Sequence, residues 1–201
     1  KQKTSYKKIK QKSISTIEYI DNWKISTNEK VIRLFAIMRN ESLRLEYFLE
    51  YYKRNGVDDF FLIDNNSTDD SVDIALQHDC VHIFKKKDTY VNHWYWMEYL
   101  LEKYGKGHWC VVVDIDELLY FPHAENLSIN QLCQYLDDSG STAFRSFLLD
   151  MYSNQAIDRI VYTVGENPLS IVSNFDKVYD KIQYVFFDRL RWHFFESTRS
   201  E

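Results

Sequence analysis

Apolar residues along this chain fall into two patterns, short continuous runs and helically spaced stripes. The continuous runs are residues 31–38, 60–63, 81–84 and 109–113. Runs of this kind are typical of strands that are buried on both faces of a sheet. Between the runs, apolar residues recur every three or four positions, which is the spacing of a helix that buries one face. The alternating order predicts an α/β fold with a mostly parallel sheet flanked by helices.

The helical stripes have recognisable ends. The first begins at Leu45 and stops at Asn55-Gly56, a pair that commonly terminates helices. The second follows Asp70, and the third covers residues 92–104. Four weaker segments are predicted as a helix near residues 15–23, a short strand at 118–121, a helix at 129–136 and a strand at 142–149. Residues 183–195 are aromatic and basic, and they fit a helix or a strand.

These patterns divide the chain into three parts. Residues 1–29 form a basic N-terminal extension, residues 30–152 form the α/β core, and residues 153–201 form a C-terminal segment whose pattern is weak. The chain has 201 residues, of which 45% are hydrophobic, so one sizeable core is expected. It has only 5 glycines and 2 prolines, which argues against a turn-rich β sandwich.

Charge is unevenly distributed. The net charge is −5, so there is no overall basic signature for nucleic acid. The first twelve residues nevertheless carry six lysines and no acid. They form either a solvated tail or a face that contacts an anionic membrane peripherally. No run approaches the ~18 apolar residues of a membrane span, and no secretory signal is visible. Cys80, Cys110 and Cys133 fit free thiols, so we expect a cytoplasmic protein, with any membrane contact at the inner face.

The fourth apolar run ends in the acidic sequence Asp114-Ile115-Asp116-Glu117. Clustered carboxylates at the end of a buried strand repel one another and lose hydration. A hard cation such as Mg²⁺ or Mn²⁺ relieves both costs by taking oxygen ligands. Asp114 and Asp116 flank one residue and are expected to project to the same side of an extended strand end. The sequence therefore predicts a metal site with open positions for phosphate oxygens, with a helix cap or solvated loop as the alternative.

Two other strands also end in polar clusters. Arg39 and Glu41 follow the first run, where they fit ligand contacts or an ion pair that caps the next helix. Asp64 and Asn65 follow the second run, and Asp64 is placed to accept hydrogen bonds from a ligand. Serine and threonine further along that loop fit a helix cap. Because the carboxyl ends of parallel strands share one edge, these clusters are expected to converge.

Asp150 ends the predicted strand at residues 142–149. A carboxylate in that position fits a general base that deprotonates an acceptor hydroxyl, or a structural hydrogen-bond acceptor. The chain contains no GxGxxG or GxxxxGK[ST] sequence, which disfavours a Rossmann dehydrogenase and a P-loop nucleoside triphosphatase.

Taken together, the strand ends resemble those of GT-A glycosyltransferases, in particular the bacterial family-2-like group and the related eukaryotic family 92 type. The matching stretches are residues 36–41, 45–57, 62–69, 109–118 and 147–152. The resemblance implies a GT-A-like sheet and transfer of a sugar from a UDP- or GDP-sugar donor to a carbohydrate or lipid-linked acceptor, in polysaccharide biosynthesis. Transfer would invert the anomeric centre. Residues 153–201 match no part of the family pattern.

The resemblance also implies roles for single residues. Arg39, Glu41, Asp64 and Asn65 would hold the nucleoside. Asp114 and Asp116 match the DxD motif, which binds Mn²⁺ or Mg²⁺ and through it the diphosphate. Glu117 would lie near the donor sugar, as a catalytic candidate, or behind the metal ligands. Two other functions use the same residues, namely a degenerate nucleotide-sugar-binding module without activity and a metal-dependent phosphohydrolase.

Overall fold

The computed structural model describes the backbone of residues 2–21, 23–176, 180–188 and 191–199. Side chains are described for residues 6–21 and 23–176. The chain divides into two compact units, residues 1–135 and residues 136–201.

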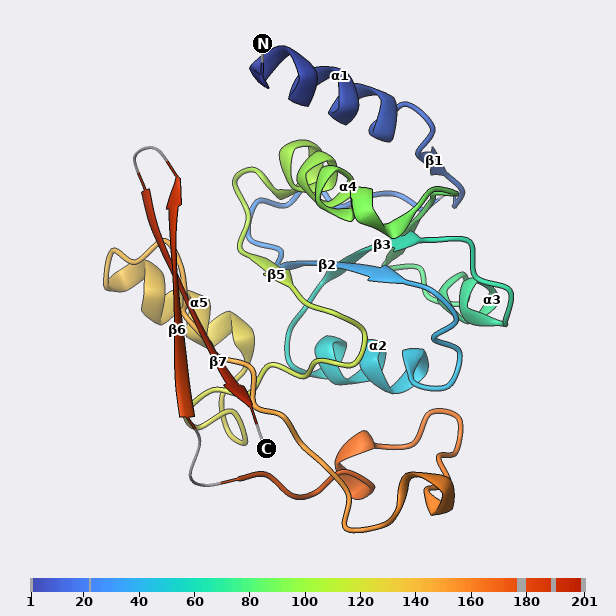
Figure 1. The fold of residues 1–201 in the computed structure, drawn as a ribbon, viewed down its shortest axis with the longest axis vertical. Coiled ribbons are helices and arrows are strands. Elements are labelled where there is room, and N and C mark those ends of the chain that lie inside the picture. The colour runs from blue at the N-terminus through green and yellow to red at the C-terminus, as the bar shows by residue number, and fades with distance from the viewer. Residues whose placement is uncertain (1, 22, 177–179, 189–190, 200–201) are drawn as a thin grey trace. The chain divides into compact units, whose positions relative to one another are not determined.

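The first unit is built on a five-stranded sheet with helices on both faces (Figure 1). In sheet order the strands are β1 (Glu18–Tyr19), β4 (Val81–Lys85), β3 (Asp59–Asp64), β2 (Arg33–Met38) and β5 (Cys110–Val112). The last four are parallel to one another, and β1 pairs antiparallel with β4. The expected α/β fold with a mostly parallel sheet is confirmed.

The direction in which the chain crosses the sheet reverses once. From β2 the chain moves to β3 and β4, and it then returns across β2 to β5 on the other side. The reversal therefore lies between β2 and β5, which are hydrogen-bonded neighbours. In open α/β sheets, ligands bind outside the carboxyl ends of the strands at such a reversal.

The described residues before position 140 form five α-helices, one π-helix and one 3₁₀ turn. The helices are α1 (Gln2–Ile14), α2 (Leu45–Arg54), α3 (Ser71–Ala75), α4 (His93–Leu100), its π-helical continuation η2 (Leu101–Gly105) and α5 (Ile129–Asp138). A short 3₁₀ turn, η1 (Tyr90–Asn92), leads into α4. The predicted helices at residues 45–52, 92–104 and 129–136 are confirmed, apart from their exact ends.

The two faces of the sheet have separate cores because successive strand residues point to opposite sides. Leu34 and Ala36 of β2 pack in one core with Phe48 and Leu49 of α2. Phe35, between them, packs in the other core with residues of β3, β4 and α4. The apolar runs thus fill both cores, which is why they show no alternation in the sequence.

The predicted stop of the first helix is also confirmed. The helix α2 ends at Arg54 with Asn55 as its C-cap, and Gly56 follows with φ of +97°. A Cβ atom at Gly56 would lie 2.7 Å from the amide nitrogen of Asn130, which itself donates to the Gly56 carbonyl. Glycine is therefore required here both by backbone conformation and by close packing against α5.

The helix α1 packs against α4 within the first unit. The side chain of Lys10 pairs with Glu98 of α4 and with Glu102 of η2, at 3.0 Å in each case. The buried Trp96 ring donates from Nε1 to Ser13 Oγ at 2.8 Å. The helix predicted near residues 15–23 is wrong, because α1 ends at Ile14 and the chain then pairs with β4 as β1. Lys1 lies outside the described residues.

A group of buried charges lies at the amino ends of the strands. We call Arg33, Asp59, His82 and Asp21 the amino-end cluster. Arg33 Nε lies 3.6 Å from Asp59 Oδ2, and His82 lies between Asp21 and Asp59 at 3.6 and 3.9 Å. The guanidinium also donates to the carbonyls of Ser26 and Tyr104. The cluster thus ties three strands to the segments that flank them.

The second unit contains little regular structure before its hairpin. The hairpin strands are β6 (Asp180–Asp188) and β7 (Arg191–Arg199), which pair antiparallel, and residues 189–190 lie outside the described residues. Two 3₁₀ turns precede them, η3 (Ile157–Arg159) and η4 (Pro168–Ser170). Residues 183–195 were expected to form a helix or a strand, and the described part of that segment forms strands.

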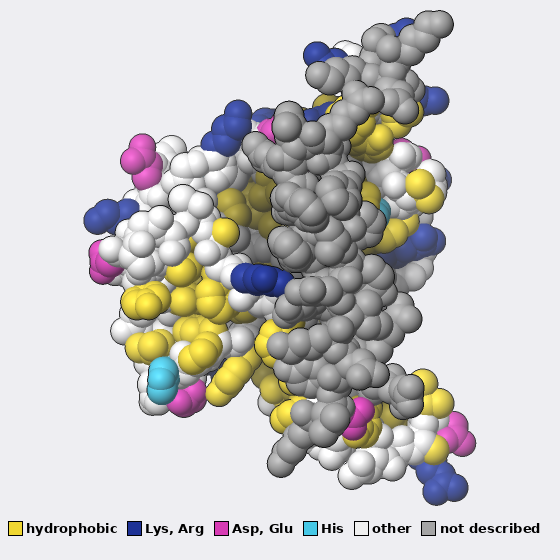
Figure 2. Space-filling model, turned by 60° about the vertical axis from the view of Figure 1, so that its left-hand side comes forward, with side chains coloured by type: hydrophobic (Ala, Val, Ile, Leu, Met, Phe, Trp, Pro, Cys, Tyr) yellow, Lys and Arg dark blue, Asp and Glu magenta, His cyan; other side chains and the backbone are white. Residues whose placement is uncertain are grey.

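The strand predicted at residues 142–149 is wrong. Over residues 142–149 the structure describes an isolated bridge at Leu148 and no continuous strand. Many apolar side chains of this unit are instead exposed, namely Phe144, Phe147, Leu148, Leu149, Tyr152, Ile157, Val161, Val164, Leu169 and Phe175. Figure 2 shows hydrophobic side chains, in yellow, at the surface of the face it presents.

Within the part of the chain that the structure describes, no helix has the length and apolar character needed to cross a bilayer.

Candidate functional site

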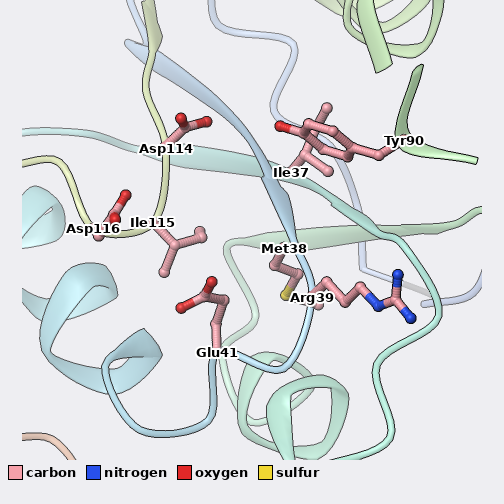
Figure 3. A pocket seen from close by; sticks show the side chains of 8 residues that line it. All are labelled: Ile37, Met38, Arg39, Glu41, Tyr90, Asp114, Ile115 and Asp116. Atoms are coloured by element: carbon pink, nitrogen blue, oxygen red, sulfur yellow. The ribbon is translucent and has the colours of Figure 1, made fainter. Parts of the chain in front are cut away.

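A pocket of about 220 Å³ opens at the carboxyl ends of β2 and β5, where the strand order reverses (Figure 3). Its lining residues are Ile37, Met38, Arg39, Glu41, Tyr90, Asp114, Ile115 and Asp116. The residues come from the end of β2, the turn after β5 and the turn before α4. The pocket thus joins two of the three polar strand ends that the sequence singled out.

The acidic sequence forms a tight turn in place of an extended strand end. Ile115 is buried, with 3% of its surface exposed, and it joins the core beneath α2. Asp114 and Asp116 on either side of it remain at the surface. Burial of the central isoleucine therefore fixes the turn and leaves two carboxylates beside the pocket.

Glu117 closes this turn and does not line the pocket. Its Oε2 accepts a hydrogen bond from the Asp114 backbone N–H at 3.0 Å, and its own N–H donates to the Asp114 carbonyl. Burial raises the pKa of Glu117, the Asp114 N–H opposes that rise, and the charges of Asp114 and Asp116 add to it. Glu117 thus positions Asp114 by holding its backbone.

Two tyrosines of α2 hold the segment that follows the turn. Tyr52 is fully buried, and its hydroxyl donates to the Glu117 carbonyl and accepts from the Leu119 N–H. The Tyr51 hydroxyl donates to the Leu119 carbonyl at 2.8 Å. The backbone groups of Glu117 and Leu119 thus bond to tyrosine hydroxyls and not to a neighbouring strand. The strand predicted at residues 118–121 is therefore wrong.

Glu41 brings a third carboxylate to the pocket. Its Oε2 lies 3.1 Å from Arg44 Nε, and Arg44 Nη1 lies 3.6 Å from Asp116 Oδ2. Glu41 Oε2 is shielded from solvent and makes no hydrogen bond, so the contact with Arg44 is electrostatic. The ion pair that the sequence suggested between Arg39 and Glu41 is replaced by this pair, because Arg44 lies one helical turn further on.

The pocket carboxylates, Glu41, Asp114 and Asp116, disfavour one another's charge. Burial raises the pKa of Asp114, the charge of Asp116 raises it further, and His93 opposes the rise. Burial also raises the pKa of Glu41; Arg44 lowers it, while Asp116, Asp69 and Asp114 raise it. The pocket therefore concentrates negative charge that Arg44 neutralises only in part.

The loops that follow β2 and β3 are joined by hydrogen bonds between side chains and backbone. The N–H groups of residues 40, 41 and 42 donate to Ser67 Oγ, Ser71 Oγ and Asp69 Oδ2, at 2.7 to 3.0 Å. Asp69 is central to this network. Although burial opposes the effect, hydrogen bonds from Ser71 and Ser42 lower the pKa of Asp69 to about 2. The network fixes the backbone from which Glu41 extends.

Asp64 and Asn65 lie beneath this network and do not line the pocket. Asp64 is fully buried; its Oδ1 accepts from the Ser67 N–H, and its Oδ2 has no hydrogen-bond partner. Asn65 is 2% exposed, and its amide nitrogen donates to the carbonyls of Lys86 and Asp88. Both side chains support the loop in this structure.

The remaining predicted residues are Arg39 and Asp150. Arg39 lines the pocket, but its guanidinium points away from the three carboxylates (Figure 3). Asp150 is an exposed residue of the second unit, and all the residues that line the pocket belong to the first.

The sequence analysis did not single out Arg44 or Tyr90. The i, i+3 spacing of Glu41 and Arg44 was a usable signal for their pairing. No sequence signal indicated Tyr90, because tertiary packing alone brings the turn after β4 to the pocket. Its ring stacks on His93 with centroids 4.4 Å apart, and its surface is 49% exposed.

Two carboxylates with hard oxygen donors fit a divalent cation that completes its coordination with phosphate oxygens and water. Among the described residues, no three His, Cys, Asp or Glu side chains are arranged to hold a metal ion. A metal on this pocket would therefore be held by Asp114 and Asp116, with most positions left for a ligand. The accumulated negative charge, and a Glu41 oxygen that accepts no hydrogen bond, favour a cation there.

No protein-family model matches the chain, and no curated protein is significantly similar to it.

Proposed function

We propose that the chain is a metal-dependent glycosyltransferase with a GT-A-like nucleotide-sugar-binding unit. The observation that supports this most is the position of Asp114 and Asp116, at the carboxyl end of β5 and beside the reversal of strand order. In such a site, two carboxylates bind a metal ion, and the metal ion binds the diphosphate of the ligand. The strand ends also resemble the GT-A pattern, and this resemblance suggests that the diphosphate belongs to a UDP- or GDP-sugar.

The pocket's size limits what it holds. Its volume of about 220 Å³ is smaller than the roughly 300–1,000 Å³ of pockets that hold drug-sized ligands, so it would suit a metal ion with a diphosphate better than a whole nucleotide sugar. The nucleoside and the sugar would therefore lie on the adjoining surface. Tyr90 and Arg39 line the pocket and offer an aromatic ring and a guanidinium to such a ligand.

In the proposed reaction, the acceptor hydroxyl attacks the anomeric carbon and the nucleoside diphosphate leaves. A bound Mn²⁺ or Mg²⁺ would act as a Lewis acid that stabilises the charge of the leaving diphosphate. Asp114 and Asp116 would bind the metal, and Glu117 would hold Asp114 in place through its backbone N–H. Asp150 remains the predicted base, and Asp150→Asn should lower nucleotide release from the donor while leaving nucleotide affinity unchanged.

Calorimetric titration tests the proposal. The protein is titrated with UDP, GDP and CDP, each with and without Mn²⁺, and one nucleotide should bind only with the metal. Asp116→Asn should abolish that binding, while Asp73→Asn, an exposed aspartate on α3, should leave it unchanged. If Asp116→Asn binds as well as the wild type, or if no nucleotide binds in either condition, the assignment is wrong.

The rival functions give different results in the same experiments. A binding module without activity would bind the nucleotide sugar with metal but release no nucleoside diphosphate from it. A phosphohydrolase would release phosphate from simple esters, and it is less well supported because two-metal hydrolases need additional converging ligands.

A further inference from the structure

The pocket carboxylates have a cationic neighbour from their own chain. Arg44 reaches from the N-cap position of α2 to Glu41 Oε2 at 3.1 Å and to Asp116 Oδ2 at 3.6 Å. It thus contacts two of the three carboxylates that repel one another. We propose that Arg44 is a built-in counter-ion that competes with the divalent cation for Asp116 and leaves that residue when the metal binds. This inference rests on the proposed function.

The contacts of Arg44 fit a temporary partner better than a structural one. Its side chain is 40% exposed and makes no capping hydrogen bond to α2. The distance of 3.6 Å to Asp116 is longer than a hydrogen bond, so little geometry is lost when the guanidinium moves away. The neighbouring solvent gives the side chain room to rotate.

The positive charge of Arg44 should weaken metal binding at Asp116. A guanidinium within ion-pair distance of Asp116 repels a divalent cation on the same carboxylate. The cation must therefore displace Arg44 from Asp116, and this requirement weakens metal binding by the free protein. In return, Arg44 keeps Glu41 and Asp116 partly neutralised when no metal is bound. The released guanidinium would still carry a charge opposite to that of an arriving diphosphate.

The test measures Mn²⁺ alone, from the electron paramagnetic resonance signal of the free ion, in the wild type and in three variants. Arg44→Gln removes the competing charge and should bind Mn²⁺ roughly ten-fold more tightly at low salt, with a smaller gain at high salt. Arg44→Lys keeps the charge and should resemble the wild type. Arg54→Gln removes an exposed arginine from the last turn of the same helix and should change little.

The sign of the change separates this role from a structural one, because loss of a structural contact would weaken metal binding. Unchanged or weaker Mn²⁺ binding by Arg44→Gln, with wild-type binding of UDP and Mn²⁺ intact, overturns the counter-ion role and leaves the proposed function standing. Absence of Mn²⁺ binding by every variant, with or without UDP, overturns both.

Discussion

The two ends of the same sheet carry ionisable groups in opposite arrangements. At the amino ends of the strands, Arg33, Asp59, His82 and Asp21 are buried and lie next to groups of opposite or variable charge. At the carboxyl ends, Glu41, Asp114 and Asp116 are all acidic, and their cationic contact comes from the half-exposed Arg44. Paired buried charges join elements together, whereas an excess of one sign leaves a site prepared for a ligand of the other sign.

The largest effect is expected at the amino-end cluster. Arg33→Met removes the guanidinium and leaves the buried Asp59 with His82, 3.9 Å away, in place of its arginine partner. Breaking a buried pair in this way costs about 3–5 kcal/mol of the free energy of unfolding. Urea unfolding followed by circular dichroism measures the loss.

Adding Asp59→Asn to Arg33→Met removes the stranded charge, so the double variant should regain part of the stability. A loss below 1 kcal/mol in the single variant would show that the cluster does not hold the strands together. The contrast between the two ends of the sheet would then fail.

A smaller effect is expected at Asp69, which joins the loops at the carboxyl end. Its pKa is lowered from the usual 3.8 to about 2, so its contribution to stability is complete above pH ~4 and is lost as the pH falls towards 2. Asp69→Asn should cost about 1–2 kcal/mol at pH 7. The difference from the wild type should disappear near pH 2.

Measuring urea midpoints of both proteins between pH 7 and pH 2 gives this curve. Asp70→Asn, which changes an exposed neighbour, provides the matched control. A difference that is independent of pH would show that Asp69 acts through packing instead of through its charge.

The smallest effect, with the opposite sign, is expected at the pocket. Burial and the charge of Asp116 raise the pKa of Asp114, so its ionised form is disfavoured in the folded protein. Asp114→Asn should leave stability unchanged or increase it by less than about 1 kcal/mol at pH 7, because the residue is largely exposed. Thermal unfolding without metal measures this change. A clear loss of stability would mean that the pocket carboxylates serve the fold as the amino-end cluster does.

The sequence predicted the sheet well because its strands are buried on both faces. Residues 31–38 and 60–63 could only be continuous apolar runs if helices covered both sides, and the structure has helices on both. The convergence of strand ends followed from parallel topology alone. The turn at Asp114 and Asp116 was misjudged as extended, because burial of Ile115 is a tertiary contact.

Other features depended on contacts between distant segments. The pairing of β1 with β4 joins residues 65 and 67 positions apart, and short polar segments carry no periodic signal for it. Asp64 and Asn65 were expected to contact a ligand, and their side chains take part in loop hydrogen bonds that depend on Ser67 and Lys86. The segment 142–149 shows the limit of local sequence pattern, because its apolar residues predicted a strand and the structure has no continuous strand there.

The strand β1 has a consequence for anyone who shortens this chain. It covers the outer edge of β4, and Asp21 beyond it accepts the Ile83 N–H at 2.6 Å. A protein that began at residue 30 would leave that row of donors and acceptors open, and it would uncover Phe84 of the second core, on which Tyr19 stacks. Open strand edges pair with other chains, so the shortened protein should self-associate and precipitate. The first residues therefore act as protection against aggregation, whatever else the lysines of α1 contact.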